Sequence, residues 1–180
     1  PRRSSFFRNE LFAALTILED GHILPEDMNG SWAGAMGQIQ FLPSVFLSSA
    51  IDYDGDGKKD IWNSLPDSLA SAANHLKSLG WKGDQTWGRP ITLPTNFDSS
   101  LASLKISKPI GDWQQMGVRK HDGSDLPTRQ LLSSIVISGS GNQQSAYLVY
   151  NNYKSTLRWN RSTMFAVSVG TLADKLAIAR

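Results

Sequence analysis

The 180-residue sequence predicts a mainly α fold of the α+β class, with a small β element late in the chain. Three segments, around 4–20, after 64 and after 162, place apolar residues at helical spacing. Two short runs rich in β-branched and aromatic residues, 131–137 and 146–150, are typical of strands. Hydrophobic residues make up 40% of the chain and charged residues 19%, which is typical of a globular protein that buries a core.

The first predicted helix begins at a serine cap, Ser4 or Ser5, and runs to about Asp20, where Gly21 ends it. One face of this helix carries Phe7, Leu11, Ala14, Leu15 and Leu18. A short helix is expected next, from Pro43 to about residue 50, because proline is favoured in the first turn of a helix.

A third helix is predicted to follow Ser64 and to close at Gly80. Its inner face is expected to carry Leu69, Ala72, Ala73 and Leu76. The last helix is expected to start after an N-cap at Ser162. Its apolar positions are Phe165, Val169, Leu172 and Leu176.

Residues 81–130 are less regular and rich in glycine, proline, threonine and aspartate. A short strand near Ile91 to Leu93 and a helix around Leu101 are the regular elements expected there. No internal repeat and no low-complexity tract interrupts the chain, so a single domain spanning 1–180 is predicted.

Composition excludes several classes of function. The net charge of +2 is too small to indicate a nucleic-acid partner, and the chain has no cysteine for disulfide, zinc-thiolate or thiol chemistry. No apolar run approaches the roughly 20 residues of a membrane span, and no signal peptide is visible. Because the sequence does not begin with methionine, we expect a processed or truncated piece. We also expect the protein to be a monomer.

The segment Gly30–Pro43 is the most informative stretch of the sequence. It combines glycines at 30, 34 and 37 with a tryptophan, a methionine and two glutamines. Glycine lets a backbone approach a ligand closely, and the interleaved side chains offer flat apolar faces and neutral hydrogen bonds. No lysine follows the glycines, which argues against a nucleotide loop. The segment therefore predicts contact with a neutral polymer that has polar and apolar faces.

A second motif, 52–60, has the spacing of a calcium loop. Oxygen donors stand at its first, third, fifth and ninth positions, glycine stands at the sixth, and the backbone carbonyl of Lys58 would supply the seventh ligand. The twelfth position is Asn63 rather than glutamate, and Asp67 is the expected substitute. A structural calcium site of modest affinity is predicted, against the alternative of a solvated Asp/Gly turn. The proposed ligands are Asp52, Asp54, Asp56, Lys58, Asp60 and Asp67.

Four parts of the chain, in this order, resemble the lytic murein transglycosylases of the B type. They are Pro1-Arg2-Arg3, the Gly30–Pro43 segment, the acidic loop running into Asp60-Ile61-Trp62, and 150–153 followed by 158–162. The resemblance implies a lysozyme-like core (1–80 and 131–180) with an irregular insertion at about 81–130. It also implies a cleft for peptidoglycan glycan strands, non-hydrolytic cleavage to 1,6-anhydromuropeptides, and a place in the periplasm or cell envelope.

The same resemblance suggests roles for individual residues. Arg2 and Arg3 would approach the acidic or peptide groups of the muramyl residue, and Ser31 and Gln40 would hydrogen-bond the sugar beside the scissile bond. The remaining cleft residues implied are Met36, Phe41, His75, Trp159, Asn160 and Phe165. His75 replaces the tyrosine that is usual in the family, and Trp159 likewise replaces a tyrosine, which keeps a stacking face but loses a hydroxyl.

The glutamic acid on which the family's chemistry rests is expected upstream of Pro1, so no catalytic residue is assigned within the sequence. Among the carboxylates present, Glu10 is predicted to be a solvated or salt-bridged helix position and Glu26 to lie in a polar loop. Three hypotheses follow: a lytic transglycosylase with its acid supplied upstream, a non-catalytic murein-binding module, or a calcium-stabilised structural domain unrelated to sugars.

Overall fold

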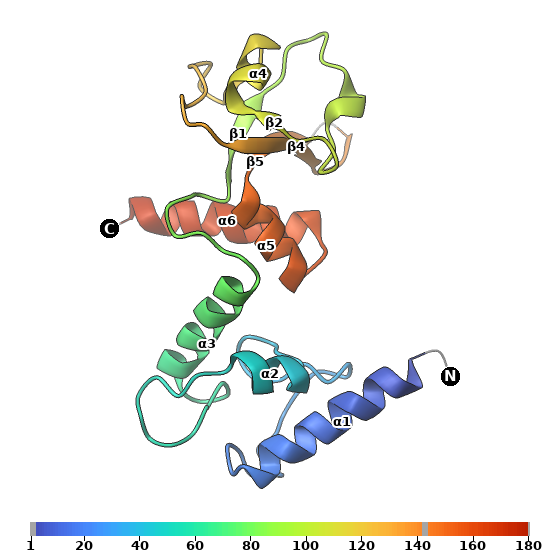
Figure 1. Cartoon of the computed structure of the whole chain (residues 1–180), viewed down its shortest axis with the longest axis vertical. Helices are drawn as coiled ribbons and strands as arrows, with labels where there is room; N and C mark the ends of the chain where they lie inside the picture. The colour runs from blue at the N-terminus through green and yellow to red at the C-terminus, as the bar shows by residue number, and fades with distance from the viewer. Residues whose placement is uncertain (1–2, 142–143, 180) are drawn as a thin grey trace. The chain divides into compact units, whose positions relative to one another are not determined.

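The computed structural model describes residues 3–141 and 144–179 (Figure 1). The chain forms two compact units, Pro1–Ser78 and Leu79–Arg180. The grouping of 1–80 with 131–180 in one core stays a prediction. None of the helices in the described ranges is long and apolar enough to cross a membrane.

The first unit contains three helices, which lie where the sequence predicts them. They are α1 (Ser4–Glu19), α2 (Pro43–Ser49) and α3 (Leu65–Ser78). The predicted serine cap of α1 is wrong, because Arg3 occupies the N-cap position with a φ of 103° and no side chain caps the helix. Gly21 ends α1 as predicted, with a left-handed φ of 74°.

The buried sides of these helices differ from the predicted ones. Helix α1 buries Ala13 and Ile17, while much of its aromatic and leucine face stays exposed. Helix α3 buries Asp67, Ser68 and Ser71, and the predicted inner face is wrong since Leu69 is 61% exposed. The physical reason is that α3 packs against loop backbone, whose N–H and C=O groups need polar partners. The Ser68 hydroxyl donates to the carbonyl of residue 61, and the Ser71 hydroxyl accepts from the amide of residue 51.

The second unit is built around an antiparallel five-stranded sheet with the order β2-β4-β5-β1-β3. Both strands predicted late in the chain are confirmed, and the 81–130 segment contributes three more. The strands are β1 (Gly88–Thr92), β2 (Lys108–Pro109), β3 (Arg119–Lys120), β4 (Leu132–Ser138) and β5 (Ser145–Val149). The helix expected around Leu101 is the short 3₁₀ helix η1 (Ser99–Leu101).

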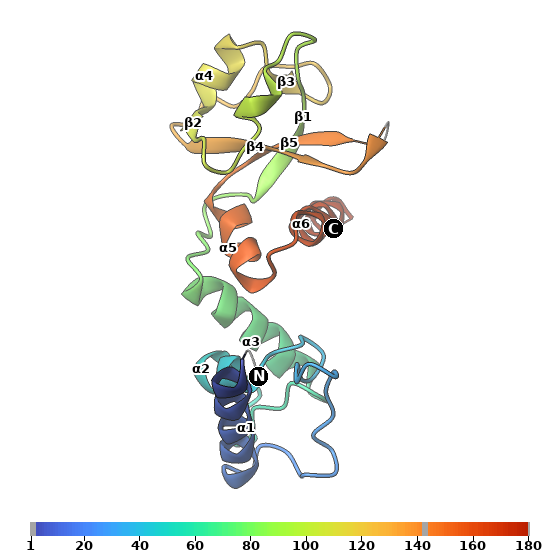
Figure 2. The same cartoon turned by 90° about the vertical axis from the view of Figure 1, so that its right-hand side faces the viewer.

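Helices cover both faces of this sheet (Figure 2). On one face, α4 (Ile110–Gln115) contributes Trp113 to a core with Ile135 and Leu148 from β4 and β5. On the other face, α5 (Asn151–Trp159) and α6 (Thr163–Ile178) pack against Trp87 and Val149. The sequence patterns predicted neither α4 nor α5.

Helix α6 begins as predicted, because the Ser162 hydroxyl accepts a hydrogen bond from the amide of Phe165 at 3.2 Å. Its predicted apolar face is wrong. The helix buries Ala166, Val167 and Gly170, whereas the side chains of residues 169, 172 and 176 are exposed. Gly170 explains why this side of α6 is the buried one, since a β-carbon there would lie 2.3 Å from the Trp87 ring. The missing side chain lets the indole pack directly on the helix.

Candidate functional site

The Gly30–Pro43 segment folds back on itself through two antiparallel bridges, which pair Met36 with Gly30 and with Phe41. The amide of Ser31 donates to the carbonyl of Ala35 at 2.7 Å. Gln40 has a left-handed φ of 54°, which is uncommon for a residue with a side chain. The segment is therefore a defined double turn that presents its outer side chains to solvent.

This double turn is fastened to the residues that precede α3. Gly37 has a φ of 66°, and a β-carbon there would lie 2.5 Å from the carbonyl oxygen of Ile61. The Gln38 amide donates to that same carbonyl at 2.9 Å, and its side-chain Nε2 donates to the carbonyl of Trp62 at 3.0 Å. Only glycine allows this approach, so the Gly-rich segment and the end of the acidic loop form one structure.

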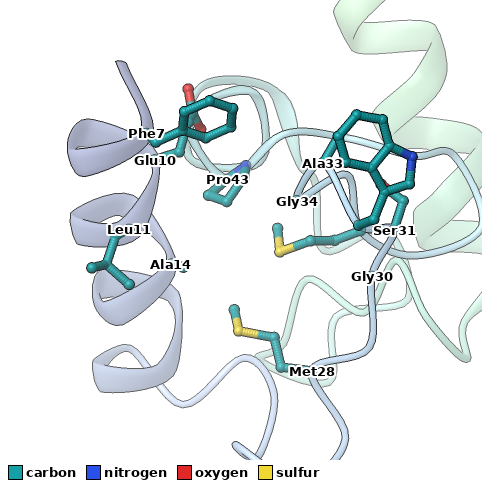
Figure 3. A pocket seen from close by; sticks show the side chains of 12 residues that line it. Phe7, Glu10, Leu11, Ala14, Met28, Gly30, Ser31, Ala33, Gly34 and Pro43 are labelled. Atoms are coloured by element: carbon teal, nitrogen blue, oxygen red, sulfur yellow. The ribbon is translucent and has the colours of Figure 1, made fainter. Parts of the chain in front are cut away.

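A pocket of about 370 Å³, which we call the α1 pocket, lies between α1 and the Gly-rich segment (Figure 3). Phe7 from α1 and Met28 from the loop point into it, and Trp32 lines it with a fully exposed side chain. Its lining is mainly apolar. Such a surface suits the flat apolar faces of a sugar ring.

A second pocket of about 610 Å³, which we call the polar pocket, is also lined by residues of the segment. The two pockets share Gly30 and Ser31 as a common wall. The other residues lining the polar pocket are Asp27, Asn29, Gly37, Gln38, Gln40, Trp62 and Asn63. Sequence reasoning assigned Ser31 and Gln40 to the cleft but missed the other polar residues of this lining. Gln38, Trp62 and Asn63 lie within motifs that the sequence analysis recognised, whereas Asp27 and Asn29 belong to no such motif.

The structure brings together four of the residues predicted to form the cleft. Ser31 and Gln40 are exposed and line the polar pocket, and Ser31 also lines the α1 pocket. Met36 lines the α1 pocket but is only 4% exposed. Phe41 is 1% exposed and lies in the core, where it supports the Gly-rich segment from the protein interior.

His75 extends this support. Its ring packs edge-on against Phe41 with ring centroids 5.1 Å apart, and its Nδ1 lies 3.0 Å from the Ser49 hydroxyl. Burial lowers the pKa of the His75 imidazole below its usual value, so the ring favours the neutral form. Its contacts join α2, α3 and the Gly-rich segment.

Glu10 also lines the α1 pocket, but both of its carboxylate oxygens take part in hydrogen bonds that hold α1 to α2. Its carboxylate accepts hydrogen bonds from the Ser44 amide at 2.9 Å and from the Ser44 hydroxyl at 2.7 Å. These bonds cap the first turn of α2. The expectation of a solvated or salt-bridged side chain at this position is therefore wrong, because the carboxylate satisfies amide groups that a helix N-terminus leaves free.

The remaining predicted cleft residues lie apart in the sequence or outside the described ranges. Arg2 is outside the described residues, and Arg3 is exposed at the start of α1. Trp159, Asn160 and Phe165 belong to the second unit, where the Asn160 Oδ1 accepts from the amide of residue 162. Their participation in a cleft with Ser31 and Gln40 stays a prediction.

The acidic loop brings three carboxylates together. Oxygen atoms of Asp52, Asp54 and Asp56 all lie within 4.8 Å of one another. The Asp52 carboxylate also accepts hydrogen bonds from the amides of Gly55 and Gly57, at 2.7 and 2.9 Å. Oxygen donors at this separation fit a hard divalent cation such as Ca²⁺.

Asp67 closes the loop from α3. This residue is fully buried, and its two carboxylate oxygens each accept a hydrogen bond at 2.8 Å, from the amides of Tyr53 and Asp60. The Asp60 side chain in turn accepts from the amides of Trp62 and residue 63. The Lys58 amide donates to the side chain of residue 56. Asp60, Asp67 and the Lys58 carbonyl stay predicted ligands.

Comparison with known proteins identifies the family. The sequence matches the family model described as Transglycosylase SLT domain over residues 1–174. Over 192 aligned positions it is 32% identical to the membrane-bound lytic murein transglycosylase B of Escherichia coli strain K12. That match covers 100% of this chain and 48% of the relative. The chain belongs to the transglycosylase SLT domain family.

Solved structures agree with this membership. SltB3 of Pseudomonas aeruginosa, in complex with NAG-anhNAM-pentapeptide, superposes on this SLT domain with a TM-score of 0.91 and 46% identity, over 97% of this chain and 47% of that one. The Escherichia coli lytic transglycosylase Slt35 in complex with calcium gives a TM-score of 0.81 at 28% identity. That match covers 100% of this chain and 56% of the Slt35 chain. These matches confirm the resemblance to B-type lytic transglycosylases and the predicted fold class. The chain spans about half the length of the relatives it matches.

Proposed function

We propose that this SLT domain supplies the substrate cleft of a peptidoglycan lytic transglycosylase. The enzyme would cleave the β-1,4 bond between N-acetylmuramic acid and N-acetylglucosamine without water and release 1,6-anhydromuropeptides. The observation that carries this proposal is the match to SltB3, a structure solved with NAG-anhNAM-pentapeptide. We further propose the periplasm or cell envelope as its location and a monomer as its state.

The proposed reaction needs one carboxylic acid used twice. The acid gives its proton to the glycosidic oxygen as the bond to the muramyl anomeric carbon breaks. The resulting carboxylate then accepts the proton of the muramyl 6-hydroxyl, whose oxygen attacks the same anomeric carbon and closes the anhydro ring. We propose that this acid comes from residues outside the present sequence.

The contribution of this chain is to bind and orient the glycan. Ser31 and Gln40 would donate and accept hydrogen bonds beside the scissile bond, and the exposed Trp32 would stack on a sugar face. Met36, Phe41 and His75 would support this part of the Gly-rich segment from the protein interior. The further binding residues we propose are Arg2, Arg3, Trp159, Asn160 and Phe165.

We also propose that the acidic loop binds Ca²⁺ in a structural role. The three clustered carboxylates are the donors that suit this ion. Since the loop ends in Trp62, whose carbonyl receives a hydrogen bond from Gln38, a bound ion would stiffen the floor of the polar pocket. When bound, the ion supplies charge neutralisation for the three aspartates.

A second candidate function is a murein-binding module without catalysis. One observation favours it: Glu10, a carboxylate lining the α1 pocket, has both oxygens engaged by Ser44. A carboxylate held in this way is a poor proton donor to a leaving oxygen.

Incubation of the complete protein, including the residues proposed to supply the acid, with purified peptidoglycan sacculi separates these functions. Release of 1,6-anhydromuropeptides, detected by mass spectrometry, supports the enzyme. Co-sedimentation without release supports the binding module, and the absence of both contradicts the murein assignment.

Two matched variants test the role of Gln40. Gln40→Asn keeps a residue that tolerates the left-handed backbone but shortens the side chain that carries the amide. The control is Gln130→Asn in the second unit. Binding should fall only in Gln40→Asn.

A further inference from the structure

We infer that the second unit holds a binding site for the acidic peptide stem of murein, at the sheet edge formed by β1 and β3. The site lies outside the Gly-rich segment and the two pockets that this segment lines. The choice of ligand rests on the proposed function, whereas the site itself consists of residues of the second unit alone.

The short strand β3 leaves part of β1 uncovered at the edge of the sheet. Strand β3 pairs with β1 only at Ile91 and Thr92, because after Lys120 the chain enters a turn closed by a hydrogen bond from the Gly123 amide to the Lys120 carbonyl at 2.9 Å. Residues 88–90 therefore pair with β5 but not with β3. A pocket of about 230 Å³, which we call the basic notch, lies at this place. It is lined by Arg89, Pro90, Lys120, His121 and Asp122.

Arg89 is held in a fixed position within the basic notch. Its Nε donates to the Tyr150 hydroxyl at 3.1 Å, and its guanidinium carbon lies 5.8 Å from the centre of the Tyr150 ring. A guanidinium has five N–H donors, and these contacts use one of them. The terminal nitrogens of Arg89 therefore remain as donors for a carboxylate, in the forked geometry that a carboxylate accepts best.

The basic notch also has positive charge in excess. Within the described part of the chain, neither Arg89 nor Lys120 forms an ion pair, whereas Arg119 and Arg129 of the same unit each pair with an aspartate. The carboxylate of Asp122 already accepts hydrogen bonds from the amide and the hydroxyl of residue 124, at 2.9 and 2.6 Å. Two cations thus face one carboxylate, and an anionic ligand would restore the balance.

A larger and more apolar pocket adjoins the basic notch. This pocket of about 600 Å³, which we call the sheet-edge pocket, shares Pro90 and His121 with the notch. Its volume is in the range of roughly 300–1,000 Å³ that is typical of small-ligand sites. Four residues on neighbouring strands stand directly opposite one another in the register of the sheet, namely Lys120, Ile91, Ala146 and Ile137. Since opposite residues of antiparallel strands share a face, one face carries a cation followed by three apolar side chains.

An acidic peptide matches both pockets. The peptide stem of murein carries free carboxylates next to the methyl groups of alanine residues. A carboxylate can therefore pair with Arg89 or Lys120 while an apolar side chain enters the sheet-edge pocket, where Ile137 is 37% exposed. A neutral sugar chain has no charge to offer these cations. The ligand of the relative SltB3 includes a pentapeptide. A site of this kind would favour glycan strands that still carry their peptides.

The test titrates the complete protein with a free stem pentapeptide that carries no sugar, and follows the methyl NMR signals of Ile91, Ala146 and Ile137. We expect these signals to shift, and we expect binding to weaken as sodium chloride is raised, because exposed opposite charges are screened by salt. An amidated form of the same pentapeptide, in which every carboxylate is neutral, should bind about tenfold more weakly.

Matched lysine variants locate the site. Lys120→Gln should weaken binding of the pentapeptide about fivefold, since one of the two cations is lost, and Lys120→Arg should restore it. The control is Lys105→Gln, an exposed lysine of the same unit that lines neither pocket, which should bind like the wild type.

Three results would overturn the inference, and one further result would overturn more. The inference fails if the pentapeptide leaves the three methyl signals unmoved, or if Lys120→Gln and Lys105→Gln bind it equally well. It also fails if a peptide of L-glutamate and L-alanine with the same length and charge binds more tightly than the stem, because the occupant would then be an acidic protein segment. In each case the proposed function stands as long as peptide-free glycan strands bind the complete protein. If neither these strands nor the pentapeptide bind, the proposed function itself fails.

Discussion

The carboxylate of Glu10 receives both the backbone amide and the hydroxyl of Ser44, at 2.9 and 2.7 Å. This pair joins the middle of α1 to the first turn of α2, 34 residues further along the chain. Glu10 therefore acts as a helix cap delivered from another helix. It holds α1 beside the Gly-rich segment that follows the loop between them.

Replacing this cap should destabilise the first unit. Glu10→Ala is expected to lower its free energy of unfolding by about 1–2 kcal/mol, since two charge-assisted hydrogen bonds at a helix N-terminus are lost. Urea denaturation followed by amide signals of α2 measures the change. Glu19→Ala, an exposed glutamate at the end of the same helix, should change stability by less than about 0.5 kcal/mol. Equal effects of the two substitutions would show that the cap does not stabilise the unit.

Removing the charge of Asp67 should loosen the acidic loop. Asp67→Asn replaces a buried carboxylate that accepts two backbone amides by a side chain with one acceptor oxygen. We expect a loss of about 2–3 kcal/mol in the unfolding free energy, and faster hydrogen exchange at the amides of Tyr53 and Asp60. Unchanged exchange at both amides would show that these hydrogen bonds do not hold the loop.

Calcium should raise the thermal stability of the chain. At an affinity of about 10⁻⁴ M, typical of extracellular sites, about 10 mM Ca²⁺ should stabilise the folded state by about 2.7 kcal/mol. Scanning calorimetry with Ca²⁺ and with a chelator measures the difference. Asp54→Ala should abolish it, because one of three clustered carboxylates is lost. A stabilisation that survives in this variant would place the ion elsewhere.

Gly170→Ala should destabilise the second unit although alanine is the better helix former. The added β-carbon would lie 2.3 Å from the Trp87 ring, so the indole or α6 must move. Overpacking of this kind costs about 1–3 kcal/mol, which outweighs the gain of about 1 kcal/mol in helix propensity. Gly111→Ala in α4 is the control, because a β-carbon added there would have no atom within 4 Å. A stabilised Gly170→Ala would contradict the packing described.

Stability should fall on acidification through His75. Burial sets the folded pKa of this imidazole below the unfolded value of about 6.5, so the unfolded chain binds the proton more readily. Stability is therefore complete above about pH 6.5 and declines as the pH drops toward the folded pKa. His75→Gln should show a shallower decline between about pH 7.5 and 5 in chemical denaturation. The residual slope is expected from His22, whose pKa is lowered by burial and by Lys59. Identical slopes for the two proteins would exclude His75 as a contributor.

The sequence predicted those elements that depend on local rules. Proline and serine at helix starts located α2 and α6, and Gly21 located the end of α1. Helix α5 escaped prediction because its residues are mainly polar and it is held by tertiary contacts. Asn152, for example, exchanges hydrogen bonds with the backbone of residues 82 and 85. No periodicity in a sequence records such a partner 70 residues away.

In the candidate site too, some features follow from local sequence rules and others depend on tertiary contacts. Glycine content and aspartate spacing indicated the Gly-rich segment and the acidic loop, because backbone conformation and ligand geometry require particular residues at fixed separations. The sequence by itself thus determined the family, the helices and strands that local rules specify, and the two motifs. Only the tertiary structure decided that Gly37 meets Ile61, that Trp62 reaches Asn29, and that the buried side of α3 is polar. Each of these depends on which backbone groups are left without partners when distant segments pack, and that is known only once the chain is folded.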